Sequence, residues 1–211
     1  MLENITINTQ SSIRIADKKV IRFDPFKIDK YYNDADLIFI THSHYDHLSI
    51  EDLNKVRKDN TIFVIPESET SKLDPLNIPK DNIIKVVPNE EYQVLDYKFN
   101  TIPSYNTNKS FHKEEYNWVG YIIEIANKKY YIAGDTDITK ENKLVKCDIA
   151  FIPIGGTYTM DYEEAAKLTN LIKPSIVIPI HYGSIVGQKE DANRFKEIVD
   201  NDIEVICLVK D

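Results

Sequence analysis

The sequence is poor in cysteine, with only Cys147 and Cys207 among its 211 residues. Both stand inside apolar runs, LVKCDIAFI and IEVICLV, where a buried and reduced thiol is the usual state of a cysteine. The sequence therefore gives no indication of a disulfide framework, and both thiols are expected to be buried.

Long hydrophobic runs are also absent. No segment approaches the roughly 20 consecutive apolar residues that cross a bilayer. The N-terminal stretch MLENITINTQSSIRIAD alternates polar and apolar residues and lacks both the basic start and the continuous apolar core of a signal peptide. We therefore expect a cytoplasmic protein without a membrane partner.

Basic residues are outnumbered, with 26 Lys and Arg against 34 Asp and Glu and a formal net charge of -8. This charge repels a phosphate backbone unless the basic residues cluster on one face, so a small molecule is a better expectation than long nucleic acid. No internal repeat, low-complexity tract or linker is visible, and residues 1–211 are expected to form one domain. The sequence does not indicate an oligomeric state.

Short strand-like segments dominate the chain, and helical patterns follow strands in its first and last parts. Strands are predicted within 5–17, 18–26, 34–41, 61–66, 83–87, 92–103, 118–126, 128–135, 147–154, 175–180 and 204–209. Helices are predicted from Ile50, with Ser49 as the cap, and over 161–172 and 192–200. The pattern predicts a layered α/β protein with helices outside packed sheets.

A histidine cluster, THSHYDHLS, directly follows the strand predicted at 34–41. His42 and His44 are two residues apart in extended chain, so their side chains point the same way and can share one metal. Asp46 and His47 are adjacent and diverge, so they can serve a second metal. Imidazole and carboxylate ligands suit zinc, manganese or iron. The alternative is a solvated loop that binds nothing, which such a density of metal-ligand side chains disfavours.

The segment HSHYDH resembles the H-x-H-x-D-H signature of the metallo-β-lactamase superfamily. The segments YYIAGDTD and IVIPIHYG place Asp135 and His181 where that superfamily carries a bridging aspartate and a final histidine. The phrases DPF, WVGY, PIGGTYTM and IPIHYG are similar to the branch that includes the ascorbate-phosphate lactonases. The resemblance implies an α/β fold of the four-layer αββα sandwich type, with a two-metal site on one edge.

One ligand departs from the family pattern. In many relatives a histidine ends the strand that reads TIPSYN here. This chain has Tyr105 and Asn106 at that point, and His112 comes six residues later. If His112 swings back, the resemblance implies one metal on His42, His44 and His112, a second on Asp46, His47 and His181, and Asp135 between them. Otherwise Asn106 or water fills the position and the first metal is held more weakly. Two zinc ions are expected, with manganese and iron as alternatives.

Further site residues are predicted with an ordinary alternative beside each. Asp24 is placed by the resemblance near the metals as an acceptor for a ligand imidazole, or it is a simple turn aspartate before proline. Trp118 and Tyr121 are interpreted as core residues. The predicted substrate contacts are Tyr105, Asn106, Gly156 and Tyr158, although a diglycine usually makes a turn and many of the 13 tyrosines must be exposed.

The resemblance implies a metal-dependent hydrolase in which two metals activate a hydroxide. Asp46 and Asp135 are the candidates to orient that nucleophile and to pass on its proton. The expected substrate is a small polar ester, lactone or amide. A phosphodiesterase acting on a small phosphodiester and a non-catalytic module that binds or senses metal remain as alternatives.

Overall fold

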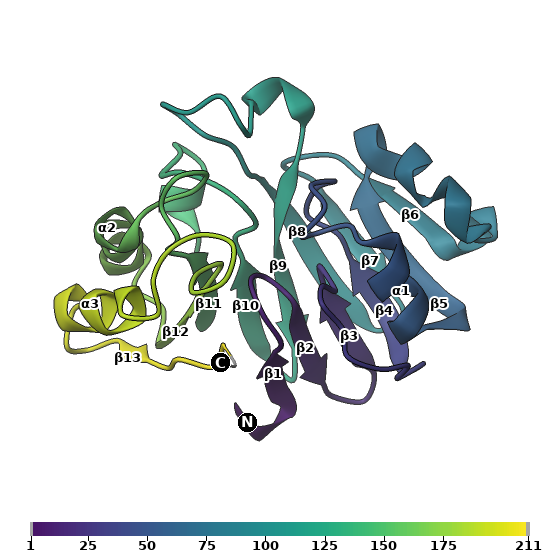
Figure 1. The fold of residues 1–211 in the computed structure, drawn as a ribbon, viewed down its shortest axis with the longest axis horizontal. Helices are drawn as coiled ribbons and strands as arrows, with labels where there is room; N and C mark the ends of the chain where they lie inside the picture. The colour runs from purple at the N-terminus through teal and green to yellow at the C-terminus, as the bar shows by residue number, and fades with distance from the viewer. Residues whose placement is uncertain (1, 210–211) are drawn as a thin grey trace.

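The computed structural model describes residues 2–209, which form two stacked β-sheets with helices on their outer faces (Figure 1). The first sheet has the strand order β1-β2-β3-β4-β5-β6, and the second has the order β13-β12-β11-β10-β9-β8-β7. The first contains β1 (Ile5–Ile7), β2 (Ile13–Ala16), β3 (Val20–Phe23), β4 (Ala35–Phe39), β5 (Arg57–Pro66) and β6 (Ile83–Val86). The second contains β7 (Glu91–Val94), β8 (Tyr97–Pro103), β9 (Val119–Ile125), β10 (Lys128–Ile132), β11 (Ile149–Pro153), β12 (Ile176–Ile180) and β13 (Glu204–Val205).

The α-helices are α1 (Ile50–Val56), α2 (Tyr162–Ile172) and α3 (Asp191–Ile198). Short 3-10 helices occur at η1 (Leu2–Asn4), η2 (Glu67–Leu76), η3 (Lys80–Asn82), η4 (Glu114–Tyr116) and η5 (Asn142–Leu144). In the chain from residue 2 to residue 209, no helix has the length and apolar character needed to cross a membrane.

The main apolar core lies between the two sheets, because alternate side chains of each strand point inward. Phe39 is near its centre, with its ring 5.0 Å from that of Phe23, 5.1 Å from Phe99 and 5.1 Å from Tyr121. The Tyr121 hydroxyl donates a hydrogen bond of 2.6 Å to the Ile40 carbonyl, which ties the second sheet to the end of β4. The interpretation of Tyr121 as a core residue is confirmed.

Two further apolar clusters lie under the helices. Leu53 of α1 and Leu73 of η2 pack with Phe63 on the outer face of the first sheet. Leu168 of α2 and Phe195 of α3 pack on the outer face of the second. The order of layers is therefore helix, sheet, sheet, helix, and the predicted four-layer αββα sandwich is confirmed.

The structure bears out the predicted helix starts but adds a helix that the sequence pattern did not show. The Ser49 side chain accepts a hydrogen bond from the Asp52 amide at the start of α1, and Asp161 and Glu164 form a capping box at α2. The unpredicted element is η2, whose sequence ESETSKLDPL contains Pro75 and lacks a helical apolar repeat. The strand expected at 92–103 is two strands, β7 and β8, joined by a turn.

The prediction that both thiols are buried is wrong for Cys207, which is exposed, and Cys147 is only partly exposed. The reason lies in the length of β13, which ends at Val205, so Cys207 follows the sheet rather than lying within it. Both cysteines are free, and burial raises the pKa of Cys147 to about 12.

The candidate ligands meet because parallel strands end together. β3, β4 and β5 are parallel neighbours in the first sheet, and β10, β11 and β12 are parallel neighbours in the second. The carboxyl ends of parallel strands lie at one edge of a sheet, where loops can place functional side chains. At this edge the Val119 amide donates to the Thr41 carbonyl at 3.3 Å, which joins the two sheets beside the histidine cluster.

An ion pair at the first sheet offers a test of its stability. The Asp34 carboxylate accepts hydrogen bonds of 2.9 Å from Nε of Arg14 and 2.9 Å from Nε of the buried Arg22. We expect Asp34→Asn to lower the free energy of unfolding at pH 7 by about 1–3 kcal/mol, less than for a fully buried pair because Asp34 is partly exposed. Urea unfolding measures this difference, with the exposed Asp59→Asn as the control.

The effect should depend on pH in a defined direction. Burial alone raises the pKa of Asp34, but the hydrogen bonds from Arg22 and Arg14 outweigh burial and lower it below the ordinary 3.8. The ion pair therefore stabilises the fold above pH 3.8, and its contribution is lost as the pH falls through the lower folded pKa. An equal loss of stability for Asp34→Asn at neutral and strongly acidic pH would contradict this assignment.

Candidate functional site

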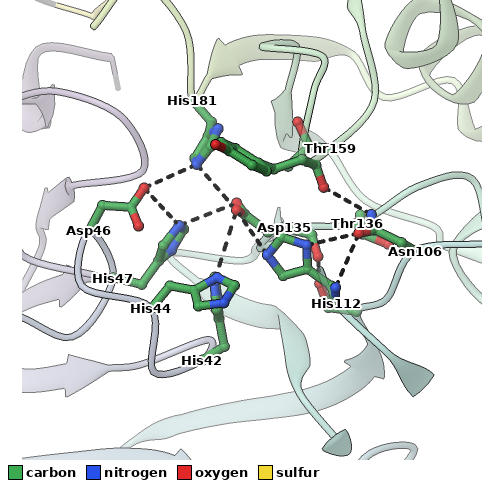
Figure 2. A network of polar contacts seen from close by, with 12 residues as sticks. His42, His44, Asp46, His47, Asn106, His112, Asp135, Thr136, Thr159 and His181 are labelled. Carbon is green, nitrogen blue, oxygen red and sulfur yellow. Dashed lines mark hydrogen bonds and ion pairs between the residues drawn. The ribbon is translucent and has the colours of Figure 1, made fainter. Parts of the chain in front are cut away.

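The histidine cluster is a tight turn that follows the end of β4. The amides of His47 and Leu48 both donate to the His44 carbonyl at 2.9 Å, so the chain reverses within the cluster. This reversal separates the side chains into two groups, as the spacing of the residues predicted. Figure 2 shows both groups converging on Asp135.

The first group consists of His42, His44 and His112, whose potential ligand atoms all lie within 4.8 Å of one another. Nε2 of His42 lies 3.1 Å from Nδ1 of His44. Nε2 of His112 lies 3.3 Å from Oδ2 of Asp135. The loop thus brings His112 back to the two motif histidines, which is the arrangement that the sequence left open.

The second group consists of Asp46, His47 and His181, again with ligand atoms within 4.8 Å of one another. Oδ2 of Asp46 lies 3.2 Å from Nε2 of His181 and 3.6 Å from Nε2 of His47. His181 follows β12 with a positive φ of 57°, a conformation that L-residues adopt rarely outside turns and functional sites.

Asp135 lies between the two groups (Figure 2). Its Oδ1 is 3.3 Å from Nε2 of His47, and its Oδ2 is 3.2 Å from Nε2 of His181 and 3.3 Å from Nε2 of His112. The preceding Gly134 has a φ of 65°, and a Cβ there would lie 3.2 Å from Cβ of Thr41. A glycine at this position lets the loop after β10 approach the loop after β4 closely.

Each group takes side chains from both sheets. His42, His44, Asp46 and His47 follow β4 of the first sheet. His112 lies between β8 and β9, Asp135 follows β10 and His181 follows β12, all in the second sheet. Neither group can therefore form within one sheet alone.

Asp24 orients His47. Its Oδ2 lies 2.7 Å from Nδ1 of His47 and accepts a hydrogen bond of 2.6 Å from the Thr41 hydroxyl. Its Oδ1 accepts a hydrogen bond of 2.8 Å from the Thr41 backbone amide. A carboxylate at Nδ1 fixes the orientation of the His47 ring, with Nε2 directed toward Asp135. Asp24 has a φ of 43°, a left-handed conformation that aspartate tolerates better than most residues.

Asn106 holds His112 in place. The Asn106 side-chain oxygen lies 3.0 Å from Nδ1 of His112 and accepts a hydrogen bond of 3.2 Å from the His112 backbone amide. The Asn106 backbone amide donates to the His112 carbonyl at 2.6 Å. The loop is anchored further by Lys109, whose Nζ lies 2.5 Å from Oδ1 of the buried Asp137. Asn106 thus contacts the His112 imidazole at the strand end where the family resemblance led us to expect a histidine.

Charges in the site compensate one another. Burial alone raises the pKa of Asp135, but the imidazoles of His181 and His47 outweigh it and hold that pKa well below its usual value. Burial opposes protonation of His181, yet the Asp135 carboxylate raises its pKa to about 9. Burial, followed by the imidazole of His47, lowers the pKa of His42 well below the ordinary value and keeps that ring neutral. The carboxylates therefore draw positive charge into the site, either as protons or as metal cations.

The residues fit a metal centre on chemical grounds. Nε2 of His47, Nε2 of His112 and Oδ1 of Asp135 are buried and have no hydrogen-bond partner among the described residues. Buried polar atoms are rarely left unpaired, and imidazole nitrogen and carboxylate oxygen are metal ligands. Cation binding would satisfy all three atoms.

Trp118 was interpreted as a core residue, and it is buried, but its ring contacts the site. Its centroid lies 4.7 Å from that of His42 and 4.9 Å from that of His44. Its Nε1 donates to Oε1 of Glu69 at 3.0 Å. The sequence carried no signal for this contact, because Trp118 continues an alternating strand pattern and Glu69 lies on the unpredicted η2.

A cleft of about 280 Å³ opens onto the site. Its lining includes the candidate ligands His44, Asp46, His112, Asp135 and His181. Its other lining residues are Tyr45, Phe111, Tyr158 and Ile185. Of these last four residues, only Tyr158 was predicted as a substrate contact, because isolated apolar residues in loops carry no pattern.

The other three predicted substrate contacts are not among the lining residues. The Tyr105 hydroxyl donates to Oε2 of Glu141 at 3.0 Å. Asn106 is engaged with His112, and Gly156 has a φ of 73° in the turn that carries Tyr158. Each therefore has a local structural partner that accounts for its position.

Comparison with known proteins gives a consistent result. A family profile described as the beta-lactamase superfamily domain matches residues 4–181. A UPF0173 metal-dependent hydrolase of Thermococcus onnurineus is 33% identical over 180 residues, covering 83% of this chain and 79% of the relative. Another, from Thermoplasma acidophilum, is 31% identical over 212 residues, covering 93% and 92%. The crystal structure of a provisionally assigned metal-dependent hydrolase from Parabacteroides distasonis superimposes with a TM-score of 0.79 and 29% identity, covering 98% of this chain and 93% of that one.

The contact between Asn106 and His112 generates a prediction about metal binding. Asn106→Ala removes the acceptor at Nδ1 and frees the imidazole to rotate, so the affinity for a divalent metal should fall about 10- to 100-fold. Competition with a chromophoric chelator measures this affinity. Asn108→Ala, an exposed change in the same loop, is the matched control. Equal affinities for the two variants would show that Asn106 does not support a ligand.

Proposed function

The chain belongs to the β-lactamase superfamily and is a metal-dependent hydrolase, and we propose that it cleaves a small carboxylic ester, lactone or amide at a centre of two metal ions. The observation that supports two ions is the pair of adjacent three-residue groups with Asp135 between them. A single ion would leave one of the two groups without a cation.

The proposed ligands divide as the two groups do. His42, His44 and His112 would hold one ion, and Asp46, His47 and His181 would hold the other, with the Asp135 carboxylate between the two groups. Zinc is the proposed metal, and the same nitrogen and oxygen ligands also suit manganese and iron. When bound, divalent ions lower the pKa of water and polarise the bond to be cleaved.

Protein side chains supply the remaining steps. Asp46 lines the cleft, and its pKa is lowered because the His181 hydrogen bond and the His47 charge outweigh burial, which raises it. An ionised carboxylate at this place can accept the proton of an attacking water, and Asp135 is the second candidate for that role. Asp24 and Asn106 keep the imidazoles of His47 and His112 oriented, so the site is assembled before substrate arrives.

Metal content and turnover test this proposal together. Protein purified without chelator should contain close to two divalent ions per chain by elemental analysis. Chelation should abolish hydrolysis of a generic aryl ester or lactone, and zinc, manganese or ferrous iron should restore it. Turnover that survives complete metal removal would refute a metal-dependent reaction, and one ion per chain at full activity would refute the two-metal centre.

Asp135→Asn tests the shared carboxylate separately. The change keeps the side-chain size but removes the charge, and we expect kcat/KM to fall by at least about 100-fold. This loss is larger than the one expected from removing a residue that only orients a ligand, such as Asn106. The number of bound ions should fall in parallel. Asp81→Asn, an exposed change on η3, is the control for the loss of a carboxylate, and unchanged activity of Asp135→Asn would remove the assignment.

A further inference from the structure

The cleft above the metal ligands has apolar and aromatic walls. Phe111, Tyr158, Tyr45 and Ile185 complete its lining beside the metal-ligand side chains. Tyr45 is 65% exposed and Phe111 is 45% exposed, so large ring surfaces face water beside the site. Single exposed rings are common on protein surfaces, but apolar side chains that gather around one cleft mark a surface that binds a ligand.

The rings are held in place by their neighbours. Phe111 and Tyr158 meet edge to face with centroids 4.7 Å apart, and Tyr45 meets Phe26 edge to face at 5.9 Å. Phe111 precedes His112, and Tyr45 stands between His44 and Asp46 in the sequence. The apolar walls therefore flank both groups of ligands.

The lining contains neither lysine nor arginine, and its only basic side chains are the candidate ligands His44, His112 and His181. Lys109, in the same loop as Phe111, is paired with Asp137 at 2.5 Å and lies 3.9 Å from Glu164. Lys27 donates to the Ser184 hydroxyl at 3.0 Å. A phosphate or carboxylate substituent normally requires an arginine, a lysine or a helix N-terminus.

We propose that the part of the substrate outside the bond to be cleaved is a small, apolar and uncharged group that packs against Phe111, Tyr158 and Ile185. This inference rests on the proposed hydrolysis of an ester, lactone or amide. The volume of about 280 Å³ lies just below the usual range of small-molecule pockets and limits the group to a short chain or a single ring. A phosphorylated substrate is therefore disfavoured.

A series of p-nitrophenyl esters tests the proposal on the metal-loaded protein. From acetate to butyrate to hexanoate, kcat/KM should rise about two- to fourfold per methylene, because each buried methylene favours binding by about that factor. The anionic hemisuccinate ester should be at least about tenfold slower than the neutral butyrate ester, whose acyl chain has the same number of carbons. A flat series, or a preference for the anionic ester, overturns the proposal.

Variants of the cleft residues test whether these side chains cause the preference for longer acyl chains. Phe111→Ala should flatten the chain-length series at unchanged metal content, whereas Phe111→Leu should keep most of it. Tyr31→Ala removes another exposed ring, which is 70% accessible and is not part of the cleft lining, and should leave the series unchanged. Ile185→Lys should raise the relative rate on the hemisuccinate at least about fivefold, and no gain there would contradict the charge argument.

Binding separates this inference from the proposed function. Alkyl hydroxamates keep one metal-binding group while the tail varies, and their affinity for the Co²⁺-loaded protein can be followed by absorption. Affinity should rise with the length of a neutral tail and fall with an anionic tail, even if no ester is cleaved. A flat hydroxamate series refutes the apolar wall. Metal-dependent cleavage of bis(p-nitrophenyl) phosphate without cleavage of esters refutes the proposed function instead.

Discussion

The buried carboxylate of Asp135 is the constraint on which the site depends. A charge that is 3% exposed is costly in a protein interior unless positive partners surround it. His181, His112 and His47 lie within 3.3 Å of its two oxygens and provide that environment. Three features keep these imidazoles in position around it. They are Gly134, the hydrogen bonds of Asn106 to His112, and the Asp24 carboxylate at Nδ1 of His47.

The candidate metal ligands and the apolar residues that line the cleft come from the same loops. Tyr45 lies between two candidate ligands, and Phe111 directly precedes a third. A change in the conformation of either loop must therefore alter both metal geometry and substrate contacts. This coupling explains why the loop of His112 is fixed at several points, including the ion pair of Lys109 with Asp137.

The sequence indicated which candidate ligand side chains come together, because their spacing has direct geometric meaning. Alternation in extended chain brings His42 and His44 together, and parallel strands bring Asp135 and His181 to the same edge. The contact of Trp118 with the histidines and the exposure of Cys207 could not be predicted in this way. The first depends on how η2 packs beside Trp118, and the second depends on where β13 ends. In both cases the local sequence pattern was that of an ordinary strand.

The division of ligands between the two sheets orders the events of folding. Asp46 and His181 are 135 residues apart, and each group needs a residue from the second half of the chain. During synthesis the motif around His42 emerges first. Neither group is complete until the later strands, which position His112 and His181, have docked against the first sheet. Loop closure over such separations comes late, so full metal capture reports that the sandwich has closed. In the proposed two-metal centre, the bound ions would cross-link the two sheets and stabilise the closed sandwich.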